Sequence, residues 1–222
     1  MRDVKIGVLK EPVSSLTHLA GFFAAIVGLV LIVQAAAHDA PKATAMAIYG
    51  TSLALLFFSS AVYHFFDLGP RGNKLLRHLD HASIFLLIAG SYVPPMLVLL
   101  GGTWRISMLI AVGGLAILGI VLQLFWMNAP RGITTTLYLA IGWIVIIPAP
   151  IILPQLDGLQ LATLIGGGLA YSVGAVVYAL KWPDPFPLRF GFHEIWHLFV
   201  LAGAGAHFAF MVTLLDVPVP VF

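Results

Sequence analysis

The sequence predicts an all-α membrane protein, a seven-transmembrane helix bundle that forms a single domain over residues 1–222. Three observations point to this fold class. Of the residues, 60% are apolar and only 9% are charged, and the mean hydropathy of +1.02 exceeds that of a water-soluble globular domain. The apolar residues form seven runs of spanning length. The basic residues concentrate in alternate segments between those runs.

Each expected helix is a run of about 20 mostly apolar residues, because a helix of that length crosses the hydrocarbon core of a bilayer. Short segments with polar residues, glycine and proline separate the runs. Pro148, Pro150 and Pro154 predict a bend in the fifth helix, because proline removes a backbone hydrogen bond. Pro94 and Pro95 predict one in the third. In chain order, the expected helices cover residues 15–37, 45–66, 81–100, 104–126, 133–153, 159–180 and 192–215.

The distribution of lysine and arginine predicts the orientation of the bundle. Cytoplasmic loops carry an excess of these residues. Of the 11 lysine and arginine residues, all but Lys42 and Arg105 fall on one side of the membrane. This places the N-terminus in the cytoplasm and, after seven spans, the C-terminus outside. The first apolar run lacks a clear cleavage site, so we expect a retained helix and not a signal peptide. The residues on the cytoplasmic side are Arg2, Lys5, Lys10, Arg71, Lys74, Arg77, Arg131, Lys181 and Arg189.

His193 and His197 stand four residues apart at the start of the last expected helix. One helical turn separates them, so both imidazoles lie on one face and can bind one ion. Polar side chains inside a membrane span are costly and usually have a partner or a function. The chain contains no cysteine, so a transition metal would be held by histidine, aspartate or glutamate. The pair is therefore a candidate for metal binding, while a structural pair stays open at this point.

The predicted topology brings His64 and Asp80 to the depth of this pair. His64 lies near the cytoplasmic end of the second expected helix, and Asp80 lies at the cytoplasmic start of the third. Three imidazoles and a water form the open coordination of catalytic zinc (Zn2+), which lowers the pKa of the bound water to about 7. A neighbouring carboxylate can orient that water or take its proton. We assign this water-handling role to Asp80 and the metal-ligand role to His64, His193 and His197.

Other readings of these residues remain. Asp80 could instead pair with Arg77 or His81 at the membrane interface. Ser60 shares a helix face with His64, and His18 begins the first helix at a similar depth, so both are candidates for the surroundings of the metal.

The string His193-Glu194-x-x-His197 also fits the H-E-x-x-H helix of zinc proteases, with Glu194 as the base. This motif is short, so a protease is kept as a rival and Glu194 as a candidate near the metal. His207 lies about 15 Å farther along the same helix, too far to bind the same ion. We expect it to be buried and hydrogen-bonded.

Four motifs lie in order along nearly the whole chain. They are Glu11-x-x-Ser14-x-x-Thr17-His18-Leu19-x-Gly21, Ser60-x-x-x-His64, Leu79-Asp80-His81-Ala82-Ser83-Ile84 with Gly90-Ser91-Tyr92-Val93-Pro94, and His193-x-x-x-His197 with His207-Phe208. Together they resemble the haemolysin III family, the bacterial branch of the progestin and adipoQ receptor group, which includes the adiponectin receptors. One departure is visible, because the family usually has Asn where this chain has Ser14.

The resemblance implies seven helices with the N-terminus inside, in a bacterial plasma (inner) membrane. It also implies a zinc ion bound by His64, His193 and His197, with Asp80 reaching the metal through water. Adiponectin receptors are linked to zinc-dependent ceramide hydrolysis, and the wider superfamily contains alkaline ceramidases. The bacterial members take their name from a haemolytic activity.

Three hypotheses for function follow. The leading one is a zinc-dependent membrane hydrolase that cuts an amide or ester of a lipid, with a ceramide-like lipid as substrate. The second is a receptor-like or stress-related membrane protein in which zinc is structural. The third is a pore-forming haemolysin, although the intramembrane polar residues gather at one end and do not line a path across. Nothing in the sequence indicates a nucleic acid partner.

Overall fold

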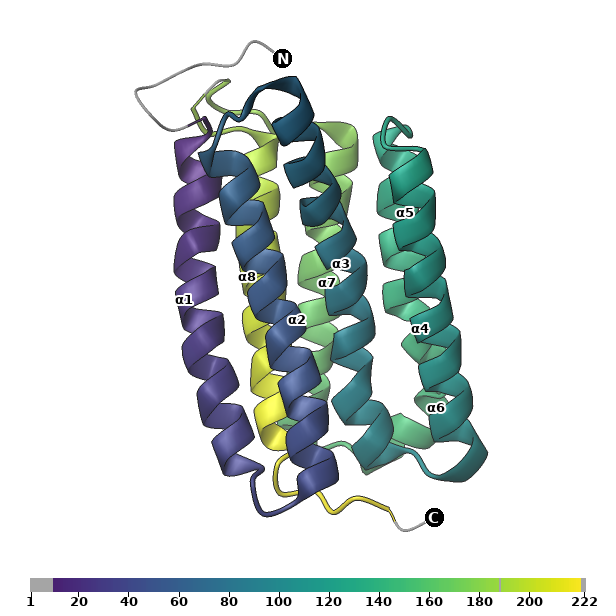
Figure 1. The fold of residues 1–222 in the computed structure, drawn as a ribbon. Coiled ribbons are helices and arrows are strands. Elements are labelled where there is room, and N and C mark those ends of the chain that lie inside the picture. Colours follow the sequence, from purple (N-terminus) through teal and green to yellow (C-terminus); the bar gives the residue numbers. More distant parts are fainter. Residues whose placement is uncertain (1–9, 188, 221–222) are drawn as a thin grey trace.

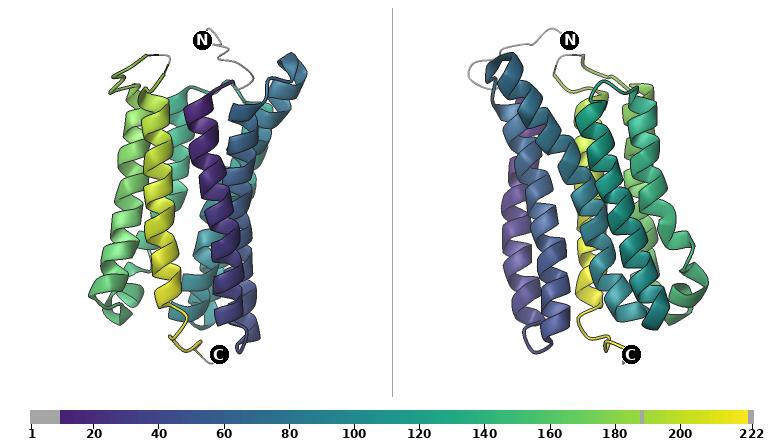
Figure 2. Two further views of the ribbon diagram at one scale, coloured as in Figure 1. Left: turned by 90° about the vertical axis from the view of Figure 1, so that its left-hand side faces the viewer. Right: turned by 45° about the vertical axis from the view of Figure 1, so that its right-hand side comes forward.

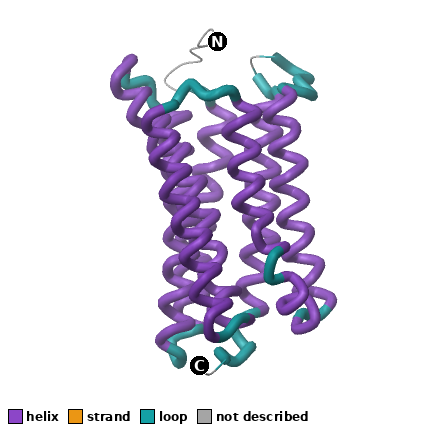
Figure 3. Tube along the Cα trace, turned by 90° about the vertical axis from the view of Figure 1, so that its right-hand side faces the viewer, coloured by secondary structure: helices purple, strands orange, loops and turns teal. Residues whose placement is uncertain are grey.

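Long apolar helices lie side by side in the computed structural model, which describes residues 10–187 and 189–220 (Figure 1). Because hydrocarbon offers no hydrogen-bond partners, an apolar run of spanning length satisfies its backbone best as a helix. Most loops gather at the two ends of the bundle, and one short break lies part way along it (Figure 3). The elements are α1 (Pro12–Ala35), α2 (Ala40–Phe65), α3 (Gly69–Leu99), α4 (Gly102–Phe125), α5 (Arg131–Gly142), η1 (Trp143–Ile146), α6 (Ala149–Ile152), η2 (Leu153–Gln155), α7 (Gly158–Leu180) and α8 (Phe192–Thr213).

Six of the described helices, α1 to α4, α7 and α8, are long and apolar enough to cross a membrane. The segment from α5 to η2 makes a seventh if its two halves, which meet at 44°, form one span. The start of α1 and the end of α8 lie at opposite ends of the bundle, in agreement with an odd number of passes (Figure 1). The sidedness stays a prediction, and Arg2 and Lys5, which contributed to it, lie outside the described residues.

Helix α3 begins at Gly69 and not at residue 81, so this expected boundary was wrong. A search for apolar runs detects only the part of a helix inside hydrocarbon, whereas the polar turns before it are also helical. The helix has Pro70 in its first turn, where a missing N–H costs nothing, and Asn73 Oδ1 accepts the backbone N–H of Leu68 at 2.9 Å. Asp80 therefore lies about three turns inside α3 and not at its start.

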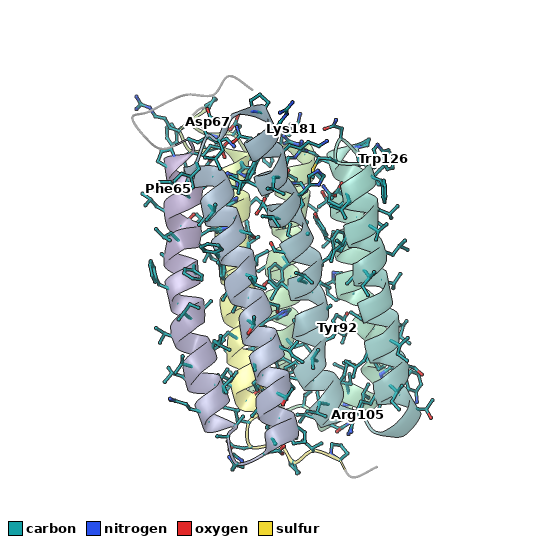
Figure 4. The ribbon with its side chains drawn as sticks, viewed as in Figure 1. Phe65, Asp67, Tyr92, Arg105, Trp126 and Lys181 are labelled. Atoms are coloured by element: carbon teal, nitrogen blue, oxygen red, sulfur yellow. The ribbon has the colours of Figure 1, made fainter. Side chains whose placement is uncertain are left out.

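The fifth expected helix is broken, as its prolines predicted. It divides into α5, η1, α6 and η2, and Pro148 stands directly before α6. The Tyr92 hydroxyl stabilises the break, because it donates to Gly142 O at 2.7 Å and accepts from Val145 N at 2.9 Å. Tyr92 comes from α3, part way along the bundle (Figure 4). By contrast, α3 continues through its own Pro94–Pro95 pair to Leu99.

The helices form a closed arrangement in which α8 packs between α1 and α7 (Figure 2). Helix α1 packs on α2, α2 on α3, α3 on α4, and α5 on α7. Gly21 of α1 faces both neighbours, since a Cβ there would lie 2.8 Å from Leu201 and 2.9 Å from Phe57. A glycine at this contact lets α1 approach α2 and α8 closely, next to His18 one turn away.

The two basic residues expected outside hold the end of the chain. The Lys42 ammonium donates to Leu215 O at 2.6 Å and Val217 O at 2.8 Å. Arg105 donates to Leu100 O at 2.8 Å and to Pro220 O at 3.1 Å. Both side chains are buried. Their charges therefore stabilise backbone carbonyls after α8 and, for Arg105, also at the end of α3, which explains two exceptions to the one-sided distribution of basic residues.

The orientation can be tested with single cysteines, because the chain has none of its own. His38 and Asn128 are exposed in loops at opposite ends of the bundle. We expect a membrane-impermeant maleimide to label His38→Cys in intact cells and Asn128→Cys only after permeabilisation. The reverse labelling pattern would invert the predicted orientation, and labelling of both from one side would contradict the helix arrangement.

Candidate metal centre

Three histidines from two helices meet near the end of the bundle where α1 begins. His64 lies in the last turn of α2, and His193 and His197 lie in the first turns of α8. One ring nitrogen from each lies within 4.8 Å of the other two. The Nε2 atoms of His64 and His193 are 3.5 Å apart, close to the ligand separation of about 3.3 Å that Zn–N bonds of about 2.0 Å give in a tetrahedral site.

Glu11 orients the first of these imidazoles. Its carboxylate lies 2.5 Å from His64 Nδ1, and its backbone N–H donates to His64 O at 2.9 Å. Burial raises the pKa of Glu11, but the hydrogen bond and charge of His64 outweigh it and lower that pKa to about 2. The ionised carboxylate only accepts, so His64 Nδ1 carries the proton and Nε2 keeps its lone pair. A carboxylate behind a histidine is the usual support of a metal ligand.

Sequence reasoning did not assign a role to Glu11. The signal was present, because Glu11 opens the first motif and precedes α1 directly. Its partner lies on another helix, at a sequence distance of 53 residues, which no spacing rule could connect.

His197 and His18 form a stacked pair, with ring centroids 3.8 Å apart and planes inclined by 18°. Both side chains are buried. Within the described part of the chain, His197 Nδ1 and both ring nitrogens of His18 have no hydrogen-bond partner. The cation argument rests on the cluster itself, because one ring nitrogen from each of its three imidazoles lies within 4.8 Å of the other two. His18 is outside the three-histidine group and is placed to hold the orientation of His197.

Asp80 is buried and lines the same cavity as the three histidines. Neither of its alternative partners engages it in the described residues. Arg77 Nη2 donates to Met127 O at 3.2 Å, and His81 Nδ1 accepts from Gln123 Nε2 at 3.0 Å. The Asp80 carboxylate is therefore not consumed by an ion pair with either residue. Its action on a metal-bound water stays a prediction.

Glu194 caps the start of α8. Its Oε2 accepts the Gly191 N–H at 2.8 Å, and its Oε1 accepts the Ser14 hydroxyl at 3.2 Å, so it also connects α1 to α8. This use of both carboxylate oxygens speaks against the protease alternative, in which Glu194 would face the water. Ser60 is buried in the cavity wall one turn from His64. Whether Ser60 or Glu194 influences a metal stays a prediction.

A cavity of about 600 Å³ extends from the histidine cluster into the bundle, a size that suits a ligand with a hydrocarbon chain. Helices α2 and α3 form one wall, and α5, α7 and α8 form the other. Arg131 stands at the polar end, with its guanidinium 5.0 Å from the Tyr178 ring. Apolar residues such as Leu99, Ile152 and Met211 line the far end. The arrangement is that of an amphipathic site, polar at one end and apolar along most of its length.

Comparison with known proteins finds relatives over nearly the whole chain. A family model described as Haemolysin-III related matches residues 6–208. Hemolysin-3 of Bacillus cereus is 35% identical over 203 residues, which is 90% of each chain. The Hemolysin-3 homolog of Bacillus subtilis is 35% identical over 215 residues, 96% of this chain and 97% of that protein. The Adiponectin receptor protein of Drosophila melanogaster is 33% identical over 155 residues, 61% of this chain and 34% of that protein.

The role of Glu11 can be tested by Glu11→Gln. A neutral amide holds the Nδ1 proton of His64 less strongly, so we expect zinc affinity to fall by about 10- to 100-fold. Competition with a chromophoric chelator measures this affinity. Asp216→Asn, which neutralises an exposed carboxylate after α8, is the matched control and should leave it unchanged. Equal affinities for Glu11→Gln and the wild type would show that Glu11 does not support the metal ligand.

Proposed function

The chain belongs to the Haemolysin-III related family, and on that premise we propose that it is a zinc-dependent hydrolase of a membrane lipid. The bond cleaved is an amide or ester, and a ceramide-like lipid is the expected substrate. One observation carries the proposal: the three-histidine cluster stands at the polar end of a cavity that is otherwise mostly apolar. We place this integral, multi-pass protein in the bacterial plasma (inner) membrane.

His64, His193 and His197 would hold the ion, and their three imidazoles are ligands that suit zinc. When bound, zinc lowers the pKa of a coordinated water and polarises a carbonyl. Glu11 holds His64 in the tautomer whose Nε2 lone pair faces the site. The stacked ring of His18 holds the plane of His197. Glu11 and His18 therefore orient two of the three ligands, His64 and His197.

Asp80 would act as the proton carrier. It lines the cavity with the histidines, and neither Arg77 nor His81 occupies its carboxylate in the described residues. In hydrolysis, the water oxygen bonds to the acyl carbon, and the bond from that carbon to the amide nitrogen or ester oxygen breaks. An Asp80 carboxylate oxygen takes the proton of the water and delivers it to the leaving nitrogen or oxygen. The apolar part of the cavity would hold the acyl chain in position for this step.

A structural role for zinc is the second candidate, and one observation favours it. The three histidines come from α2 and α8, two helices that otherwise make few direct contacts. A metal between them would crosslink α2 to α8. In this alternative, loss of the metal lowers stability and no lipid is turned over.

The test combines metal content with hydrolysis on the same samples. Wild type, Asp80→Ala and His197→Ala are purified, zinc is determined by elemental analysis, and fatty acid release is assayed on a panel of ceramides and other lipids. We expect near-stoichiometric zinc in wild type and Asp80→Ala, less in His197→Ala, and fatty acid release by the wild type alone. The expected loss in Asp80→Ala is about 100- to 10,000-fold, the usual contribution of a general base.

Two results would contradict the hydrolase. Zinc without turnover of any lipid would favour the structural alternative. Full activity after all three histidines are changed to alanine would exclude a zinc mechanism at this site.

A further inference from the structure

A second group of polar side chains lines the cavity deep in the bundle. We call Tyr49, Tyr171 and His207 the mid-cavity station; they come from α2, α7 and α8. His207 lies ten residues after His197 in α8, about 15 Å along the helix. The rings of Tyr171 and His207 are 5.4 Å apart, and the Tyr49 ring is 6.5 Å from Phe208, the neighbour of His207. The station is therefore separate from the metal centre and shares its cavity.

The Tyr49 hydroxyl has no hydrogen-bond partner among the described residues. Its side chain is only 1% exposed, and no described residue accepts or donates a hydrogen bond at its oxygen. Tyr92, which also lines the cavity and stands part way along the bundle, makes three hydrogen bonds at the α5 break (Figure 4). Buried hydroxyls are nearly always satisfied, so an unpaired one on a side chain that lines a cavity indicates a ligand or a water there.

His207 supplies the complementary group. Its Nε2 lies 3.2 Å from Leu164 O, and a carbonyl only accepts, so this nitrogen carries the ring proton. The Nδ1 atom of the neutral ring is then an acceptor, and no described residue donates to it. Tyr49 thus offers a free donor and His207 a free acceptor. A ligand hydroxyl has one of each and can pair with either group, whereas a methylene group can pair with neither.

The station depends on two glycines placed reciprocally on the facing helices. A Cβ on Gly167 of α7 would collide with the ring of His207 on α8. A Cβ on Gly203 of α8 would lie 2.9 Å from the ring of Tyr171 on α7. Each helix therefore leaves room for the polar ring of the other. Their rings reach the cavity wall because these two positions lack side chains.

We propose that the mid-cavity station binds a hydroxyl on the hydrocarbon chain of a lipid whose polar head lies at the metal centre. The ligand class is a lipid chain hydroxylated near its middle. The inference rests on the proposed function in one respect, the placement of the lipid's polar head at the metal centre. It does not require that the lipid be hydrolysed. It adds a determinant of chain specificity, about 15 Å along α8 from His197, to a cavity whose wall there is otherwise mostly apolar.

Binding of three fatty acids to the purified, zinc-loaded protein tests the inference. The probes are stearate, 12-hydroxystearate with its hydroxyl well along the chain, and 2-hydroxystearate with its hydroxyl beside the head. Dissociation constants come from displacement of a fluorescent fatty acid. We expect 12-hydroxystearate to bind about three- to tenfold more tightly than stearate, the effect of one buried hydrogen bond, and 2-hydroxystearate to show no such gain.

Tyr49→Phe should abolish this ratio, since it removes one oxygen atom and keeps the ring. Tyr138→Phe is the matched control. The Tyr138 hydroxyl also lies in the wall of this cavity, buried and with no hydrogen-bond partner in the described part of the chain. Its ring packs 4.7 Å from Phe85, nearer to Asp80. Tyr138→Phe should keep the preference for 12-hydroxystearate. Thermal unfolding of both variants establishes that they are folded.

The outcomes separate this inference from the proposed function. Equal affinity of the wild type for all three probes overturns the station and leaves the hydrolase proposal standing. In that case water, and not a lipid hydroxyl, is the partner of Tyr49. A preference that survives Tyr49→Phe also overturns it. A preference that Tyr49→Phe abolishes supports the station even if no lipid is hydrolysed, and that result counts against the hydrolase alone. Failure of every fatty acid to bind would overturn the station and leave the hydrolase proposal to its own test of zinc content and lipid turnover.

Discussion

The contact between Glu11 and His64 joins the residue directly before α1 to the candidate metal centre. It orders the segment before α1 against the end of α2, where the Glu11 N–H also meets His64 O. Ser14, three residues later, donates to Glu194 and ties α1 to α8. Between these two connections, α1 brings His18 onto His197. The first helix therefore supplies none of the three clustered histidines and yet orients two of them, one through a carboxylate and one through a stacked ring.

A polar group removed from water must find a hydrogen-bond partner, and this requirement explains the contacts of the buried polar residues along the bundle. At the end of the bundle where α1 begins, it gathers the three imidazoles of the candidate metal centre. At the opposite end it directs Lys42 and Arg105 to backbone carbonyls around the residues after α8. At the break after α5, the Tyr92 hydroxyl donates to the carbonyl of Gly142. Tyr49 and Tyr138 are the contrasting cases, since both line the cavity and their buried hydroxyl oxygens have no partner in the described residues.

The sequence indicated the candidate site well where its members share a helix, and less well where they do not. The four-residue spacing of His193 and His197 sufficed, because helix geometry alone places such residues on one face. Placing His64 at the same depth as this pair required a topology, which the hydropathy runs and the basic residues supplied. The support of His64 by Glu11 and of His197 by His18 depends on how α1, α2 and α8 approach one another. Interhelical approach depends on small residues such as Gly21, whose neighbours no local pattern identifies.

Composition and hydropathy by themselves determined that the chain is helical and multi-pass, because a bilayer admits few other ways to satisfy an apolar backbone. They also predicted the broken fifth helix, since the loss of an N–H at proline is a local event. The start of α3 at Gly69 and the position of Asp80 three turns inside that helix came only from the structure, because polar helical turns outside hydrocarbon leave no apolar signal. The cavity and its mid-cavity station are likewise tertiary. They arise where side chains from α2, α7 and α8 face one another across space, and sequence separation carries no information about such distances.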